Sequence, residues 1–296
     1  MQIPTNAFYD RATQSMRGLT VQADSLQTQI STGKKLSAPS QNTAAYQRLA
    51  TLKQAGADSD AYGTNLSLAG SLLASADTTL GAMSSQLQRA SELTLQARNG
   101  TQNDSSRKAI SDELDQIVES LVALGNTRDP RGQPLFGGVE GGAAVTKANG
   151  GYSFASTPLT AIPIGDAQSV QATEPASRVF AAGGTDILTA LTAFSTALKA
   201  GGDIDSAATT ALGDIAASSQ QVDTVQASLG ARAARVDLEQ SQQKSASTDR
   251  ETVRSSLEDT DIATAITQLQ KTMTILSATQ ASFSKLSSLT LFNYIK

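Results

Sequence analysis

The chain has 296 residues, of which 39% are hydrophobic but only 4% aromatic, and it contains no Trp. Its 23 basic and 27 acidic residues give a net charge of -4, and no basic run supplies the positive surface that nucleic-acid binding needs. The absence of Cys and His argues against disulfides, thiolate or imidazole catalysis and a zinc site. Much of the apolar fraction is Ala, which favours long helices packed through narrow stripes over a conventional globule.

The first predicted element is a helix that starts near Phe8. Its apolar or small residues recur at alternating spacings of three and four, close to a heptad repeat. The stripe consists of Phe8, Ala12, Met16, Leu19, Ala23, Leu26 and Ile30. The helix should end at "STGKKLSAPS", where Gly33 can adopt a left-handed cap and Pro39 cannot continue a helix.

Two further helices are predicted before the middle of the chain. The first begins near Ser40 and runs to about Arg98, with a stripe of Tyr62, Leu66, Ala69, Leu73, Ala76, Leu80, Met83 and Leu87. After the turn "RNGTQND", Asn103 or Asp104 can cap the next helix. Its stripe contains Ile110, Leu114, Ile117, Leu121 and Leu124.

The segment 129–184 has a different composition, rich in Gly and Pro, and "GYSFAS" and "TAIPI" are its short β-type runs. It predicts a small β-containing insertion, followed by a short helix over 186–199. A long helix is then expected from about 207 to 256, with Val222, Leu229 and Val236 on its apolar stripe.

The last predicted helix follows "LEDTD", where Asp259 or Asp261 can cap it. Its stripe is Ile262, Ile266, Leu269, Met273, Leu276, Gln280 and Phe283, and it leads into the apolar ending "KLSSLTLFNYIK". Ordering such a tail costs about as much free energy as burying its large side chains returns. We therefore expect the terminus to fold on assembly with a partner chain.

These elements predict a mainly α fold, an elongated antiparallel helical bundle or coiled coil with the β-containing insertion at its far end. The expected divisions are an N-terminal assembly helix (1–40), a helical rod (41–128 and 185–256), the outer insertion domain (129–184) and a C-terminal assembly helix (257–296). No stretch of 18 apolar residues indicates membrane insertion.

The chemical candidates are better explained structurally. "GGVEGG" around 137–142 lacks the strand and helix of a phosphate-binding loop, so we predict no cofactor. Two acidic clusters are expected to cap helices or face solvent, and "GGDIDS" is expected to form a turn. The clusters are Asp112, Glu113 and Asp115, and Glu258, Asp259 and Asp261. No catalytic or metal site is predicted, and an enzyme or carbohydrate-binding module in 129–184 is a minor alternative.

Two distant blocks resemble bacterial flagellins. The first is "IPTNAFYDRATQSMRGLTVQADSLQTQISTGKKL" with the helix that follows it, and the second is "LEDTDIATAITQLQKTMTILSATQASFSKLSSLTLFNYI". Within that family, "IPTNAFYD", "SAPSQNTAAYQRL", "DPRGQPLFGG" and "ASLGARAARVDLEQ" are more similar to the hook-associated protein 3 branch, whose members join hook to filament.

The resemblance implies a structural subunit of the bacterial flagellum that assembles axially through its terminal helices, with a filament flagellin as the alternative. Implied partners are further copies of the chain, hook-associated protein 1, flagellin and a flagellar export chaperone. It also implies an extracellular location, at the hook-filament junction, reached by type III export without a cleaved signal peptide. The first 30 residues contain no apolar signal-peptide region.

The heptad stripes and the apolar tail together predict an assembly interface. It consists of Leu19, Leu26, Ile30, Ile266, Leu269, Met273, Leu276, Phe283, Leu291, Phe292 and Tyr294. A cytoplasmic coiled-coil scaffold would show similar stripes, but it would have no evident use for the apolar C-terminus.

Overall fold

The computed structural model describes residues 5–99, 102–137, 142–148, 150–182 and 184–292. These residues form seven α-helices and six short strands, which confirms the mainly α prediction. Contacts divide the chain into two compact units. Unit 1 comprises 1–57 and 245–296, and unit 2 comprises 58–244.

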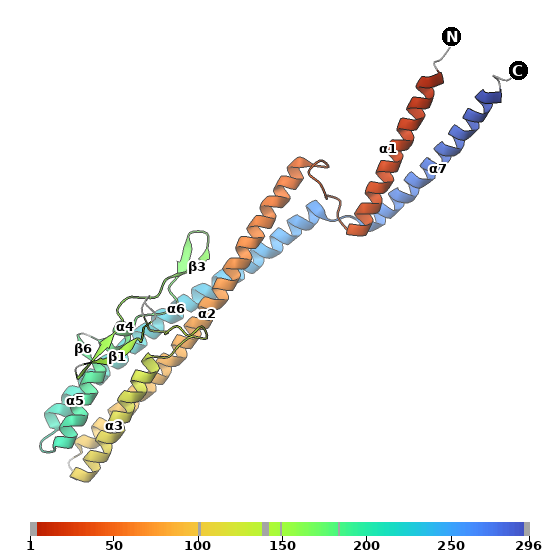
Figure 1. Ribbon diagram of the computed structural model, residues 1–296. Helices are drawn as coiled ribbons and strands as arrows, with labels where there is room; N and C mark the ends of the chain where they lie inside the picture. Colours follow the sequence, from red (N-terminus) through yellow and green to blue (C-terminus); the bar gives the residue numbers. More distant parts are fainter. Residues whose placement is uncertain (1–4, 100–101, 138–141, 149, 183, 293–296) are drawn as a thin grey trace. The chain divides into compact units, whose positions relative to one another are not determined.

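Unit 1 contains the antiparallel pair α1 (Thr5–Thr32) and α7 (Ile262–Phe292), together with parts of α2 (Thr43–Arg98) and α6 (Asp205–Glu258). The α1 and α7 helices lie side by side along their lengths (Figure 1). The rings of Tyr9 and Phe283 meet edge to face, with centroids 5.4 Å apart. Ala23 and Leu26 on α1 are buried, as is Ala265 on α7.

Unit 2 is built on the rest of α2 and α6 together with α3 (Asp104–Gly125) and α5 (Ile187–Ala200). The α2 and α6 helices run antiparallel, since Asp77 accepts a hydrogen bond from Gln226 at 2.9 Å and Gly70 lies beside Val236. The α3 and α5 helices pack closely together. At the end of unit 2 where α2 finishes and α6 begins, Arg98 pairs with Asp205 at 2.7 Å.

Three antiparallel hairpins and one short helix follow α3. The hairpins are β1 (Val145–Ala148) with β2 (Gly151–Phe154), β3 (Ile162–Gly165) with β4 (Gln168–Val170), and β5 (Ala181–Ala182) with β6 (Thr185–Asp186). The short helix is α4 (Ala176–Phe180). The predicted run "GYSFAS" thus contains β2 and "TAIPI" overlaps most of β3, whereas α4 and the remaining strands were not predicted.

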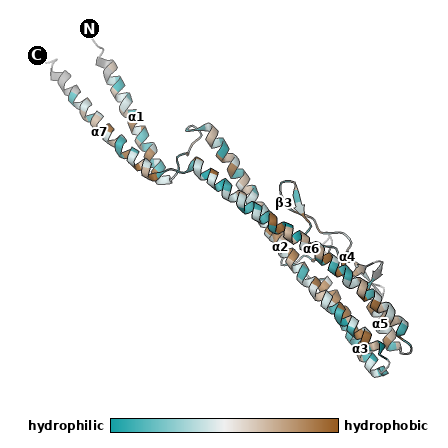
Figure 2. Cartoon of the chain, turned by 180° about the vertical axis from the view of Figure 1, so that it is seen from behind, coloured by the Kyte–Doolittle hydropathy of each residue, from teal (hydrophilic) through white to brown (hydrophobic). Residues whose placement is uncertain are grey.

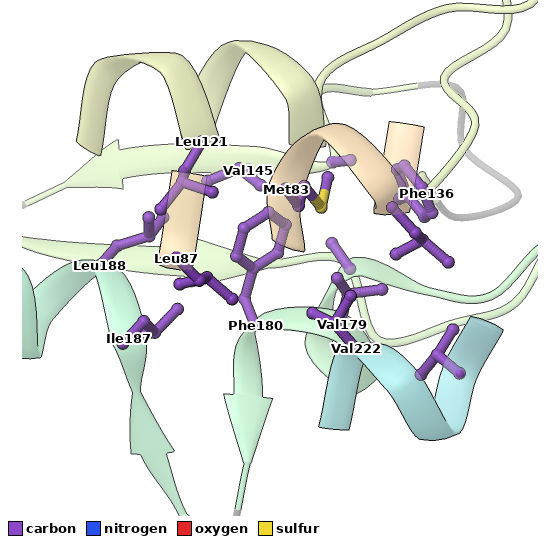
Figure 3. Packing of buried hydrophobic residues seen from close by; sticks show 14 of the residues in the cluster. Met83, Leu87, Leu121, Phe136, Val145, Val179, Phe180, Ile187, Leu188 and Val222 are labelled. Atoms are coloured by element: carbon purple, nitrogen blue, oxygen red, sulfur yellow. The ribbon is translucent and has the colours of Figure 1, made fainter. Parts of the chain in front are cut away.

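The hairpin segment shares one apolar core with the helices of unit 2. Figure 3 shows Phe180 from α4 among Met83, Leu87 and Val145, and its ring stacks on Phe154 with centroids 5.5 Å apart. The α2 stripe from Leu66 to Leu87 is buried, as predicted, because its three-four spacing keeps one face inward.

The expected position of the insertion at the far end is wrong. Asn65 in α2 donates to the Pro163 carbonyl at 2.8 Å, and Arg232 in α6 donates to the Gln171 carbonyl at 2.9 Å. The β3–β4 hairpin therefore lies along the sides of α2 and α6. That far end of unit 2 is where α2 finishes and α6 begins, and Arg98 pairs with Asp205 there.

Candidate assembly surface

The structure divides the predicted assembly interface between the inside and the outside of the α1–α7 pair. Leu26 is buried, and a half-buried group lies along the contact between the two helices: Leu19, Ile30, Leu269, Leu276 and Phe283. Ile266 and Met273 are 41% and 50% exposed. Leu291 and Phe292 belong to the last turn of α7, where the structure describes only the backbone, and Tyr294 lies outside the described residues.

Ile266 and Met273 belong to an exposed apolar stripe, which we define as Ile262, Ile266 and Met273. Their spacings of four and seven residues place the three side chains on one face of α7, beside its contact with α1. Figure 2 shows apolar residues on α7 alternating with polar ones. Exposed apolar residues gathered on one helix face are typical of an interaction surface.

Small side chains form part of the α1–α7 contact. Ala265 and Thr272 are buried on α7, and Thr279 is half-buried at the next seven-residue step. Sequence reasoning missed this row because it followed the larger residues, although the repeat of Ala or Thr every seven positions was a usable signal. The larger residues of the exposed stripe lie on α7 to one side of this row.

The apolar core of unit 1 is small. Among side chains that the structure describes, those buried and apolar in this unit are Ala23, Leu26, Leu36, Leu49 and Ala265. Unit 2 contains an extended cluster that includes Leu, Ile, Val, Met and Phe from all of its helices. Because apolar burial is the main stabilising contribution, unit 1 has more to gain from contact with another molecule.

Two connectors join the α1–α7 pair to the rest of unit 1, and we define them as residues 33–36 and 256–261. Lys34 and Asp259 form an antiparallel bridge, and the Thr260 amide donates to the Gly33 carbonyl at 2.8 Å. Gly33 has φ +71°, a conformation that favours glycine where α1 ends. Asp261 caps α7 by accepting hydrogen bonds from the Ala263 and Thr264 amides, as predicted.

Glu258 was predicted to cap a helix or face solvent, and this is wrong. Its side chain is only 3% exposed, and its carboxylate contacts Lys34 Nζ at 2.5 Å and Arg254 Nη1 at 2.8 Å. The hydrogen bond from Lys34 lowers the pKa of Glu258, against the opposing effect of burial, and Arg254 lowers it further. The chain buries this carboxylate because two cations from different segments compensate its charge.

The other acidic cluster does not cap α3, but Asp112 and Glu113 are exposed, as expected, and its members also form ion pairs with other helices. Glu113 binds Arg89 of α2 at 2.7 Å, and Asp115 pairs with Lys199 of α5 and accepts from Ser195 at 2.6 Å. These residues lie beyond the first turn of α3, whose N-cap is Asn103. Ion pairs to α2 and α5 therefore account for the positions of Glu113 and Asp115.

No other chemical site emerges from the described part of the chain. Asp203 accepts from the Asp205 amide at 3.0 Å, which gives the turn expected for "GGDIDS", whereas residues 138–141 of "GGVEGG" lie outside the described residues. Within the described ranges, no group of three or more carboxylates is arranged to hold a metal ion. No described helix is long and apolar enough to cross a membrane.

Two family models match the two ends of the chain. The model of the bacterial flagellin N-terminal helical region matches residues 3–140, and that of the bacterial flagellin C-terminal helical region matches residues 212–295. The chain belongs to the flagellin family. Both matched regions include a helix of the α1–α7 pair, so the candidate surface lies within the parts that define the family.

Individual relatives of this flagellin-family chain fall into two groups. Flagellar hook-associated protein 3 of Salmonella typhimurium is 31% identical over 164 residues, covering 54% of this chain and 51% of the relative. The flagellin of Listeria monocytogenes is 25% identical over 287 residues, covering 97% of this chain and 95% of the relative. The chain thus matches about half the length of the hook-associated relative and nearly all of the flagellin.

A solved structure gives the same fold assignment. A protein described as a flagellar hook-associated protein from Vibrio parahaemolyticus superposes with a TM-score of 0.70 at 20% identity, covering 74% of this chain and all of that one. The flagellin-family fold therefore extends through most of the chain.

Proposed function

We propose that this flagellin-family chain is a structural subunit of the bacterial flagellum, placed at the hook-filament junction and not an enzyme. The observation that carries the proposal is the exposed apolar stripe of α7 beside a contact built on small residues. That arrangement offers apolar surface to a neighbouring subunit while α1 and α7 are still paired.

The proposed interface comprises both the exposed stripe and the rest of the predicted set. Residues between α1 and α7, such as Leu19 and Leu276, hold the pair together, and Ile266 and Met273 contact the neighbour. Leu291, Phe292 and Tyr294 extend the surface at the C-terminal end. Helices that present apolar residues at such spacings pack readily into the grooves of other helices.

The partners follow from the family and from the relatives' names. The matches to hook-associated protein 3 favour the junction, with hook-associated protein 1 and flagellin as axial neighbours. We further propose that the chain travels unfolded through the flagellar type III apparatus to its extracellular position. A cytoplasmic chaperone would mask the apolar C-terminal segment beforehand.

A filament flagellin is the second candidate, because the Listeria flagellin matches nearly the full length of both chains. Labelling the protein along intact flagella separates the two. A single band next to the hook supports the junction, and continuous labelling along the filament overturns it in favour of a flagellin.

Removal of residues 286–296 tests the assembly role itself. We expect the truncated chain to keep the folded unit 2, whose core lies within 58–244, and to lose assembly. A truncated protein that still forms tubes or occupies junctions would refute the role proposed for the C-terminal segment.

A further inference from the structure

The two connectors of unit 1 meet in a small network whose centre is Glu258. Besides its side-chain pairs with Lys34 and Arg254, the backbone carbonyl of Glu258 accepts a hydrogen bond from the Lys35 amide at 2.8 Å. Lys35 Nζ donates to the Ser256 carbonyl at 2.6 Å. Several contacts therefore hold the two connectors together, and three of them involve Glu258.

We propose that Glu258 is a latch: its charge keeps the two connectors closed and thereby sets the register in which α1 pairs with α7. The inference rests on contacts inside unit 1 and does not depend on the proposed place in the flagellum.

Burial makes Glu258 suited to this role. An exposed ion pair contributes little, because water and salt screen it, but the Glu258 carboxylate is 3% exposed and has a cation at each oxygen. If the charge is removed, Lys34 and Arg254 lose their common partner. Arg254 keeps Glu251 as a partner, so a closed latch is then no longer favoured over one in which water solvates Lys34.

The connectors contribute to the register of the helix pair because the small side chains in the α1–α7 contact specify it weakly. Ala265 and Thr272 offer little shape to distinguish one alignment from another, whereas the Lys34–Asp259 bridge fixes the start of α7 against the end of α1. An error of one turn at that point would displace Tyr9 from Phe283 at the other end of the pair. The latch therefore acts at the position where an alignment error affects the whole contact.

The test uses the full chain with Glu258→Gln, which keeps the shape of the side chain but removes its charge. The matched control is Glu251→Gln, because Glu251 also pairs with Arg254 but its side chain is 63% exposed. A second variant, Lys34→Met, removes the charge from the other side. Hydrogen exchange is measured for peptides covering both connectors and, as an internal reference, α3.

We expect Glu258→Gln and Lys34→Met to increase exchange at the Lys35 and Thr260 amides about tenfold or more, with α3 unchanged. Glu251→Gln should resemble the parent. Three results would overturn the proposal. The connector amides could be unprotected in the parent, their exchange could be unchanged in Glu258→Gln, or their exchange could increase equally in the Glu251→Gln control. A loss of protection in α3 as well would also overturn it, since Glu258 would then act on general stability.

Register is measured separately with spin labels at Gln14→Cys on α1 and Ser277→Cys on α7. The native chain contains no Cys, so the labels are confined to these two exposed positions. A latch requires a single narrow distance distribution in the parent and the Glu251→Gln control, and one at least twice as wide in Glu258→Gln. Equal widths in the parent and Glu258→Gln would show that the connectors do not set the register.

Discussion

The exposed stripe of α7 can be tested with the double substitution Ile266→Ser and Met273→Ser. These side chains are 41% and 50% exposed in the single chain, and full burial of a large aliphatic side chain contributes about 1.5–3 kcal/mol. Covering the exposed part of each should thus contribute roughly 1 kcal/mol. The pair of substitutions should weaken one subunit contact by about 2 kcal/mol, or roughly 30-fold in association constant.

Assembly is followed by sedimentation of the purified full chain over a concentration series, alone and with isolated flagellar hooks. Ser has about the helix propensity of Ile and a slightly lower one than Met; the resulting loss of helical content should be small, and circular dichroism checks this. The matched control is Leu95→Ser with Leu238→Ser, both 56% exposed and both outside the stripe. The control should sediment like the parent.

Two results would refute this reasoning. The stripe variant could assemble at the same concentration as the parent, in which case Ile266 and Met273 remain exposed in the assembly. Alternatively, the control pair could weaken assembly as strongly as the stripe variant. Assembly would then depend on total apolar surface rather than on one face of α7.

Three other substitutions give direct tests of local structure. Gly125→Ala would bring Cβ to 2.7 Å from Val145 Cγ2 and 2.9 Å from Phe180 Cε2. This overpacking should lower the unfolding free energy measured in urea titrations by about 1–3 kcal/mol. An unchanged urea midpoint would contradict the prediction. Asp261→Ala removes the α7 cap and should cost about 1 kcal/mol, seen as faster hydrogen exchange in the first turn of α7 but not in α3. Burial raises the pKa of Asp115, but hydrogen bonds from Lys199 and Ser195 outweigh it and lower the pKa below the ordinary 3.8. The ionised carboxylate therefore stabilises unit 2 above that pH, and this contribution is lost as the pH falls through the lowered pKa. The Asp115→Asn variant should accordingly lose less unfolding free energy on acidification than the parent does.

The helices could be predicted from the sequence because their stripes are regular and their ends carry ordinary signals. Gly33 ends α1, Asn103 caps α3 and Asp261 caps α7, each for the local reason that its residue type indicates. The α2 stripe is buried because its spacing of three and four holds over many turns. Such features depend on neighbours in the chain and need no tertiary information.

The pairings between distant segments could not be predicted in this way. Glu258 is the last residue of the long polar helix α6, and its position gave no sign that it would be buried beside Lys34, more than 200 residues away. Asp115 had the composition of a capping cluster, but α5 brings Lys199 to it. Ionised groups acquire partners only when the fold brings the elements together, so the sequence alone favoured solvation.

The same limit applies to the assembly surface, where the sequence identified a stripe but not which residues it would leave exposed. Leu269 and Ile266 looked equivalent in the heptad pattern, yet Leu269 is half-buried toward α1 and Ile266 is exposed. Around the helix, Leu269 lies nearer than Ile266 to the buried Ala265 and Thr272, so Ile266 falls outside the contact with α1. The apolar stripe of α7 is wider than α1 alone can cover. A subunit needs such a stripe if it is to hold its own helix pair together and contact a neighbouring subunit at the same time. The small residues of α7 are thus as important to the proposed assembly as the large ones, because they decide which large residues stay available.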